Sequence, residues 1–343
     1  MKRYGVVGTG WIAEAYIQGA ALTGEWELAA VCSRSGERGR ALADRYGAGR
    51  VYTSPADMAA DPSVDAVYIA SPNALHTSQS RLFLEAGKHV LCEKPLAVTA
   101  AELRGLTALS EQKGLVYMEA IMMLHLPARR ILHRAAATLG RIRSARLDFS
   151  QLSSKYPLYL RGERPNIFNP SLATGCLMDL GLYCVYAALD LFGRPEKITA
   201  SAGFLPPVPP EEGAALSDGW GTALFHYPDK LVTLTYSKVG QGFAGSEICG
   251  DEGTLVIDSI SKLTGIRRVT PGGTVEELVG DVSKPELMSG EARDLSRWID
   301  DPAGTREARA LASRLALQTC ESLEEIRRRT GIVFPTSPIG GPR

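Results

Sequence analysis

The chain has 343 residues, enough for about two domains, and 45% of them are hydrophobic, which excludes disorder of the chain as a whole. Its 38 Lys and Arg residues balance 38 Asp and Glu residues, so the formal net charge is zero. A protein that neutralises nucleic-acid phosphates is expected to be basic, so no nucleic-acid partner is expected. A neutral chain has little charge protection against self-association, which favours an oligomer.

Cysteine, histidine and hydropathy patterns exclude other classes. The six cysteines form no C-x-x-C pair and the five histidines show no H-x-x-x-H spacing, so we expect free thiols and no metal site. There is no run of 18 apolar residues, and the first residues do not suit a signal peptide. We therefore expect a cytoplasmic protein with no membrane partner.

Short apolar strands alternate with helical patterns over the first third of the chain. Strands that are apolar throughout and separated by helices are typical of a doubly wound parallel sheet covered on both faces. The predicted strands are 4–7, 28–32, 65–70, 89–92 and 116–118, and the predicted helices are 11–21, 37–46, 75–86 and 99–113.

The pattern changes near residue 120. A helix expected at 127–139 is followed by strands that alternate more and by short turns, which favours an antiparallel sheet. We therefore expect an α/β protein with one domain over 1–120 and a second over 121–343. The predicted strands of the second domain are 142–149, 198–202, 221–226, 232–237, 247–249, 254–257 and 265–269, and its last helices are 287–299 and 306–328.

A glycine-rich segment follows the first predicted strand and opens the first predicted helix. It reads Gly-Thr-Gly-Trp-Ile-Ala from Gly8 to Ala13. Gly8 permits a tight turn, Gly10 lets the backbone approach a pyrophosphate, and Ala13 allows close packing of helix on sheet. This pattern predicts that a dinucleotide is bound by Gly8, Thr9, Gly10, Trp11 and Ile12.

The end of the second strand indicates which dinucleotide is bound. Proteins that bind NAD usually place an acidic residue there for the ribose hydroxyls, but this chain has Ser33 and Arg34, and no acid before Glu37. Arg34 can pair with a 2′-phosphate, Ser33 can donate a hydrogen bond to it, and Arg38 can flank it. The sequence therefore favours NADP over NAD, although a solvated basic loop would read the same way.

Two further segments make a family resemblance visible. Residues 86–96 contain Glu93-Lys94-Pro95, and residues 175–183 read Gly-Cys-Leu-Met-Asp-Leu-Gly-Leu-Tyr. With the glycine loop they resemble the glucose–fructose oxidoreductase/inositol dehydrogenase (Gfo/Idh/MocA) family over nearly the whole chain. This resemblance implies an N-terminal Rossmann domain and a C-terminal α/β domain with a large, mostly antiparallel open sheet. It also implies a homodimer or tetramer formed through that sheet.

The resemblance assigns catalytic roles to three residues. Lys94 stands at the end of a parallel strand, where its ammonium can stabilise an alkoxide and lower the pKa of a neighbouring phenol. Tyr183 stands where many relatives have a histidine, and this departure resembles the branch that contains dimeric dihydrodiol dehydrogenases and glucose–fructose oxidoreductases. A tyrosine there can exchange the substrate proton. Asp179, four residues earlier on the same helical face, orients the substrate or Lys94. The alternatives are that Tyr183 is a core tyrosine and that Asp179 is a structural acid.

Other residues are assigned to the cofactor site by the same resemblance. His76 could instead be a buried helix-face histidine, and Glu119 could instead form a structural salt bridge. His125 is a weaker candidate for the substrate pocket, while Arg161 and Arg164 are more typical of surface charge. The additional cofactor-site candidates are Ser71, Pro72, Asn73, His76, Glu93, Lys94 and Glu119.

The function predicted from these residues is NADP-dependent hydride transfer to or from a carbinol or carbonyl carbon. The expected substrate is a sugar, a polyol or a dihydrodiol. Two alternatives stay open at this point: a catalytically inactive protein of the same fold that senses a nucleotide or sugar, and a glycosidase that uses tightly bound NAD.

Overall fold

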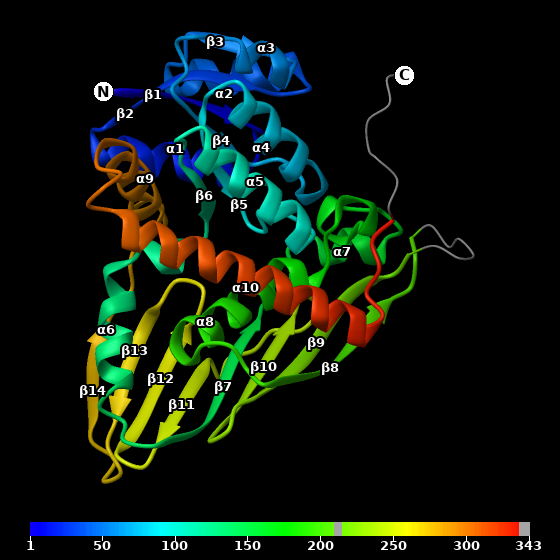
Figure 1. Cartoon of the computed structure of the whole chain (residues 1–343). Coiled ribbons are helices and arrows are strands. Elements are labelled where there is room, and N and C mark those ends of the chain that lie inside the picture. The colour runs from blue at the N-terminus through cyan, green and yellow to red at the C-terminus, as the bar shows by residue number, and fades with distance from the viewer. Residues whose placement is uncertain (209–214, 336–343) are drawn as a thin grey trace. The chain divides into compact units, whose positions relative to one another are not determined.

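The computed structural model describes residues 1–208 and 215–335, and its contacts divide the chain into two compact units. Unit 1 comprises Met1–His125 and Val282–Leu317, and unit 2 comprises Leu126–Asp281 and Gln318–Arg343. The chain therefore enters each unit twice, and the long helix α10 (Arg306–Thr330) contributes to both (Figure 1). The sequence-based division at residue 120 does not include this return.

Unit 1 is built on a six-stranded parallel sheet, as the sequence predicts. The strand order is β3-β2-β1-β4-β5-β6, so the order reverses between β1 and β4, which is where doubly wound sheets bind ligands. The strands are β1 (Lys2–Val7), β2 (Trp26–Cys32), β3 (Arg50–Tyr52), β4 (Ala66–Ile69), β5 (His89–Glu93) and β6 (Tyr117–Ala120). The helices between them are α1 (Trp11–Thr23), α2 (Gly36–Tyr46), α3 (Pro55–Ala59), η1 (Asn73–Leu75), α4 (His76–Glu85) and α5 (Ala100–Gln112), and η2 (Met122–His125) follows β6.

A helix from late in the sequence completes unit 1. Helix α9 (Lys284–Asp300) packs on α1, and the contact depends on Gly19, because a Cβ there would lie 2.7 Å from Cβ of Met288. The indole N–H of Trp26 donates a hydrogen bond to the carbonyl oxygen of Ala292 at 2.9 Å. Unit 1 therefore gains the side chains of α9.

Unit 2 contains the large open sheet that the resemblance implies. Its strand order is β14-β13-β12-β11-β7-β10-β9-β8, and the only parallel pair among its described strands is β7 with β10. The strands are β7 (Ile142–Ser150), β8 (Lys197–Leu205), β9 (Ser217–His226), β10 (Leu231–Ser237), β11 (Ser246–Gly250), β12 (Gly253–Ser259), β13 (Thr264–Val269) and β14 (Val275–Val279).

Helices of unit 2 cover one face of this sheet. Helix α8 (Leu182–Phe192) lies against β7 and β10, α6 (Pro127–Ala136) lies against β13 and β14, and Asp190 of α8 accepts hydrogen bonds from Arg129 and His133 of α6. The helical stretch Pro170–Phe192 is long and apolar enough to cross a membrane. However, 89% of its apolar 18-residue window is buried inside the protein, as in a core helix. The shorter helical segments are α7 (Tyr156–Leu160), η3 (Asn166–Phe168), η4 (Pro170–Leu172) and the π-helical turn η5 (Leu177–Gly181).

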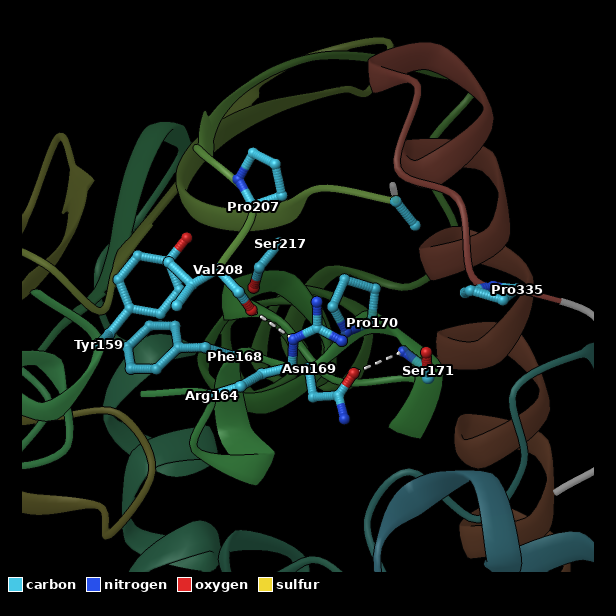
Figure 2. A pocket seen from close by; sticks show the side chains of 11 residues that line it. Tyr159, Arg164, Phe168, Asn169, Pro170, Ser171, Pro207, Val208, Ser217 and Pro335 are labelled. Carbon is cyan, nitrogen blue, oxygen red and sulfur yellow. Dashed lines mark hydrogen bonds between the residues drawn. The ribbon is translucent and has the colours of Figure 1, made fainter. Parts of the chain in front are cut away.

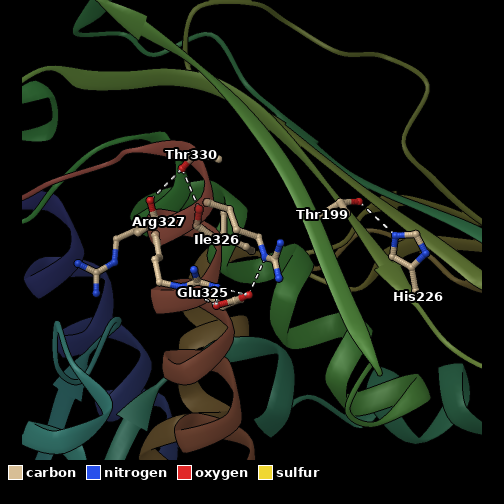
Figure 3. Close-up of polar contacts among 8 residues, drawn as sticks. Thr199, His226, Glu325, Ile326, Arg327 and Thr330 are labelled. Atoms are coloured by element: carbon tan, nitrogen blue, oxygen red, sulfur yellow. Dashed lines mark hydrogen bonds and ion pairs between the residues drawn. The ribbon is translucent and has the colours of Figure 1, made fainter.

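Figure 3 shows side-chain hydrogen bonds at the end of helix α10. At the end of α10 the hydroxyl of Thr330 donates to the carbonyl oxygen of Ile326 at 2.8 Å, and the carboxylate of Glu325 accepts from Arg328 and Arg329. These guanidinium hydrogen bonds, led by that of Arg328, lower the pKa of Glu325. The cationic last turn suits the negative end of the helix dipole.

Candidate active site

The glycine loop leaves open space at the start of α1. Gly8 has a φ of +113°, and a Cβ there would lie 2.6 Å from the carbonyl oxygen of Ala70, so only glycine fits. Gly10 precedes α1 without a side-chain cap, and no atom lies within 4 Å of the position its Cβ would take. Backbone N–H groups at an uncapped helix start favour an anion. The loop therefore fits the diphosphate of a dinucleotide.

The remaining loop residues differ in exposure. Thr9 and Ile12 are partly exposed, and Trp11 is exposed. The ammonium nitrogen of Lys284 lies 5.6 Å from the centre of the Trp11 ring, so α9 supplies a positive charge next to the loop. No local pattern near the loop points to this lysine, because it comes from the returning segment of unit 1.

Two exposed arginines follow β2, Arg34 in the turn after the strand and Arg38 in the first turn of α2. Arg34 and Arg38 are exposed and, within the part of the chain that the structure describes, have no acidic partner. Ser35 caps α2 by accepting a hydrogen bond from the N–H of Arg38 at 3.3 Å, and Ser33 accepts from the N–H of Ser35 at 3.3 Å. This arrangement can hold an anionic group without displacing an ion pair.

Lys94 follows β5 in a turn that His76 supports. The Lys94–Pro95 peptide bond is cis. The ring of His76 is fully buried, with Nδ1 2.8 Å from the carbonyl oxygen of Pro95 and Nε2 2.8 Å from that of Ser71. Burial lowers the pKa of His76. His76 therefore braces two loops, Ser71–Asn73 and the Lys94 turn, rather than presenting an exposed ring.

Two acids lie next to Lys94. The carboxylate of Glu119 on β6 accepts the N–H of Leu96 at 3.0 Å, and burial raises the pKa of Glu119 to about 8. The hydroxyl of Tyr68 donates to Glu93, whose pKa burial also raises. The positive charge of Lys94 opposes both of these rises. In unit 1 the predicted residues thus gather at the carboxyl ends of neighbouring strands, which is where a nucleotide binds in this fold.

Asp179 and Tyr183 lie in unit 2, at the start of the buried helix α8. The structure places Asp179 in the π-helical turn η5, whereas the face expected to be shared with Tyr183 assumed ordinary α-helical spacing, and such turns are frequent at functional sites. The side chain of Asp179 is 33% exposed. Tyr183 is largely buried, and its ring meets that of Phe149 edge to face at 5.5 Å. One helical stretch therefore carries both residues, while Lys94 belongs to unit 1.

A pocket in unit 2 is lined in part by residues 159–171, which precede this motif in the sequence (Figure 2). Its volume is about 250 Å³, and its walls combine the rings of Tyr159 and Phe168 with the polar side chains of Arg164, Asn169 and Ser217. Arg164 donates from Nε to the carbonyl oxygen of Val208 at 2.5 Å. Arg164 is thus a pocket residue as well as a surface charge, and the pocket suits a polar ligand.

Two further predicted positions have structural partners. His125 is buried, with Nδ1 2.8 Å from the carboxylate of Asp294, and its ring meets that of Trp298 at 5.8 Å. Arg161 is exposed and lies 3.4 Å from the carboxylate of Glu163. Each side chain is thus paired with a carboxylate of its own unit.

A buried lysine beside Asp179 was not predicted from the sequence. The ammonium nitrogen of Lys238 lies 2.8 Å from Oδ2 of Asp179, and the side chain of Lys238 is 1% exposed. The local sequence Tyr-Ser-Lys-Val-Gly gives no signal for this role. Only the pairing of β10 with its neighbours brings Lys238 to the motif.

The fold and the glycine loop together define a dinucleotide-binding oxidoreductase with a second unit built on an open sheet. The chain belongs to the Gfo/Idh/MocA oxidoreductase family. The family's domain described as "Oxidoreductase family, NAD-binding Rossmann fold" matches residues 2–121, and its C-terminal domain matches residues 128–256. The predicted family and fold class are therefore confirmed.

Characterised relatives cover almost the whole chain. It is 35% identical to the scyllo-inositol 2-dehydrogenase (NADP(+)) IolU of Bacillus subtilis, over 98% of this chain and 99% of that one. It is 36% identical to the trans-1,2-dihydrobenzene-1,2-diol dehydrogenase of Mus musculus, over 97% and 98% of the two chains. KijD10, a 3-ketoreductase of Actinomadura kijaniata solved with NADP and TDP-benzene, has the same fold, with a TM-score of 0.80, 23% identity and coverage of 96% and 98%.

Proposed function

We propose that this oxidoreductase uses NADP to transfer a hydride to or from a carbinol or carbonyl carbon of a sugar, a polyol or a dihydrodiol. The observation that carries the proposal is Lys94 at the end of β5, flanked by Glu93 and Glu119 in the unit that also carries the open glycine loop. We assign cofactor binding to domain 1–120, and substrate binding and oligomer formation to domain 121–343.

Three residues of the chain share the chemistry in this proposal. Bound NADP or NADPH supplies the hydride acceptor or donor. The ammonium of Lys94 stabilises the negative charge that develops on the substrate oxygen. The phenolate of Tyr183 takes the proton of that oxygen during oxidation, the resulting phenol returns it during reduction, and Asp179 orients the substrate hydroxyl.

Free positive charge at the end of β2 supports the choice of NADP. Arg34 and Arg38 are exposed there, and Ser33 is adjacent. A guanidinium binds a 2′-phosphate through charge-assisted hydrogen bonds, whereas no acidic residue stands between Cys32 and Glu37 to bind the ribose hydroxyls of NAD. The name of the Bacillus subtilis relative specifies NADP, and KijD10 was solved with it.

The substrate class is inferred from the relatives and from the polar pocket. The names of the two characterised relatives specify a polyol and a dihydrodiol, and Arg164, Asn169 and Ser217 offer hydrogen-bonding groups of the kind that hydroxyl-rich molecules need. We infer a small hydroxylated substrate, a cofactor that exchanges freely, and a protein that acts in the cytoplasm.

A substrate panel tests the function. Purified protein is incubated with scyllo-inositol, myo-inositol, D-xylose, D-glucose or trans-1,2-dihydrobenzene-1,2-diol and either NADP+ or NAD+, and absorbance at 340 nm is followed. We expect turnover of at least one substrate, with kcat/KM at least about tenfold higher for NADP+, because one charge-assisted hydrogen bond contributes about 1.5–3 kcal/mol. Equal efficiency with both cofactors contradicts the cofactor assignment. No turnover of any of these substrates, with protein that binds a sugar or carries undialysable NAD, contradicts the proposed reaction.

We also propose a homodimer, or a tetramer of dimers, formed through the open face of the unit 2 sheet. Side chains such as Trp220, which is 46% exposed, lie on the β9 positions that alternate with the buried ones. The ring of Trp220 covers Gly203 of β8, where a side chain would collide with it. Such a broad, partly apolar sheet face is suited to a symmetric interface.

A further inference from the structure

The buried lysine of unit 2 is surrounded by acceptors. The ammonium nitrogen of Lys238 lies 2.8 Å from Oδ2 of Asp179, and 3.4 and 3.5 Å from the carbonyl oxygens of Gly175 and Ile167. It also lies 5.6 Å from the centre of the Phe168 ring. An ammonium without water contact requires a paired charge and hydrogen-bond acceptors, and this site provides both.

Backbone pairing fixes Lys238 next to a second buried acid. The N–H of Lys238 donates to the carbonyl oxygen of Gly219 at 2.9 Å, which extends the pairing of β10 with β9 by one residue. Asp218, the neighbour of Gly219, is fully buried, and its carboxylate accepts the N–H of Leu177 at 2.6 Å. The end of β10 and the start of β9 therefore hold Lys238 and Asp218 next to the first turn of the Gly175–Tyr183 motif.

The carboxylate of Asp218 explains the glycine that opens this motif. A Cβ at Gly175 would collide with Oδ1 of Asp218, so only glycine leaves room for the carboxylate. Burial raises the pKa of Asp218 to about 6, against hydrogen bonding to Leu177 and the positive charge of Lys238. The start of η5 is thus held by a specific buried carboxylate.

We propose that Lys238 is a positioning residue for the reaction, which holds the carboxylate of Asp179 ionised and in one orientation, while Asp218 anchors the first turn of η5. This inference rests on the proposed function, because it serves the role given there to Asp179. A purely structural role would not require charge, since well-packed apolar residues replace buried ion pairs without loss of stability in many proteins. In this pair Lys238 is buried, whereas Asp179 remains 33% exposed.

Titration of Asp179 tests the inference without any substrate. The charged and titratable groups around the pair include Lys238 and Cys176 beside Asp179, Asp218 beside Lys238 and Cys176, and Tyr236 close to Asp218 and Cys176. The protein is labelled with 13C at aspartate carboxyl groups, and Asp179→Asn assigns the signal. We expect the Asp179 signal of the wild type to titrate below the ordinary value of about 3.9, and to move up by about one unit or more in Lys238→Met. Lys262→Met, which removes an exposed lysine of the same unit, is the matched control.

Kinetics add a second readout, measured with NADP+ and the best substrate of the panel. We expect Lys238→Met to lower kcat/KM at least about tenfold and to move its acidic limb to higher pH, with the NADP+ Kd unchanged. In the Asp179→Asn background, Lys238→Met should have little further effect on kcat/KM, because Lys238 acts through Asp179.

Each outcome separates this inference from the proposed function. If Asp179→Asn leaves kcat/KM unchanged, the role of Asp179 in the proposed function is wrong. If Asp179→Asn is impaired while Lys238→Met titrates and turns over like Lys262→Met, only the positioning role is wrong. Lys238→Gln replaces Lys238→Met if the latter does not fold. A wild-type Asp179 that titrates at or above about 3.9 overturns the inference without any variant.

Discussion

Arg34 is the residue on which the cofactor choice depends. It is exposed at the end of β2 without an acidic partner among the described residues. We expect Arg34→Ala to lower kcat/KM for NADP+ by about 10- to 100-fold, because a charge-assisted hydrogen bond to a phosphate is lost. The value for NAD+ should change less than about twofold, because NAD+ lacks that phosphate. Steady-state kinetics with both cofactors measure this, and Arg40→Ala on the exposed side of α2 is the control. A parallel loss with both cofactors would contradict the assignment.

Glu119 links the Lys94 site to the pH dependence of stability. Its pKa is about 8 in the folded protein and ordinarily 4.5, so between these values the folded state retains a proton that the unfolded chain has lost. Stability from this group therefore falls as pH rises from about 4.5 to about 8. Glu119→Gln keeps an acceptor for the N–H of Leu96 and removes this loss. We expect the variant to gain about 1–3 kcal/mol relative to wild type at pH 8 and little at pH 5, from urea unfolding. Glu111→Gln, at an exposed position, should show no such pH-dependent gain.

At the scale of a single element, the β1–α1 loop uses one glycine for stability and another for cofactor binding. Gly8 has a positive φ and no room for a Cβ, whereas Gly10 has ordinary backbone angles and open space. We expect Gly8→Ala to destabilise the protein by about 2 kcal/mol or more through strain and collision with Ala70. Gly10→Ala should cost less than about 1 kcal/mol but weaken NADP+ binding about tenfold or more, because its methyl group occupies the diphosphate space. Thermal melts and titration calorimetry distinguish the two, and equal effects of both variants would contradict this account of the loop.

Local chemistry explains which elements could be predicted from the sequence. The buried strands of unit 1 are apolar throughout, and the glycine loop carries its geometry in six consecutive residues, so both were predicted and the parallel sheet is confirmed. The short segments β3, α3, α7 and β14 were missed, because three to five residues carry too little periodicity. The π-helical turn at Asp179 and the role of Lys238 depend on long-range pairing, which no local pattern encodes.

At the scale of the whole molecule, the return of the chain to unit 1 was the main feature the sequence did not predict. Helix α9 was expected from its periodicity, but its packing partner depends on contacts between residues about 270 positions apart, such as Trp26 with Ala292. Gly19 on α1 leaves the room for this contact, but a single small residue does not identify a packing partner. Unit 1 therefore requires two stretches of the chain.

Self-association belongs to the same scale. We expect the protein to sediment at twice its chain mass of 36.9 kDa or more, and Trp220→Glu to shift it to the monomer, because the charge would be buried in the interface without a partner. Leu22→Glu, at an exposed position of α1, should leave the oligomer intact. Analytical ultracentrifugation decides between these outcomes, and a Trp220→Glu variant that sediments like wild type would remove the open sheet face as the interface.

The central claim is that Tyr183 exchanges the substrate proton in an NADP-dependent reaction, and Tyr183→Phe tests it most directly. Phenylalanine keeps the ring and its edge-to-face contact with Phe149 while removing the hydroxyl. With the best substrate of the panel we expect kcat to fall about 100-fold or more, the usual scale of general acid–base catalysis, while calorimetry shows an unchanged Kd for NADP+. Turnover close to that of wild type in Tyr183→Phe would contradict the account.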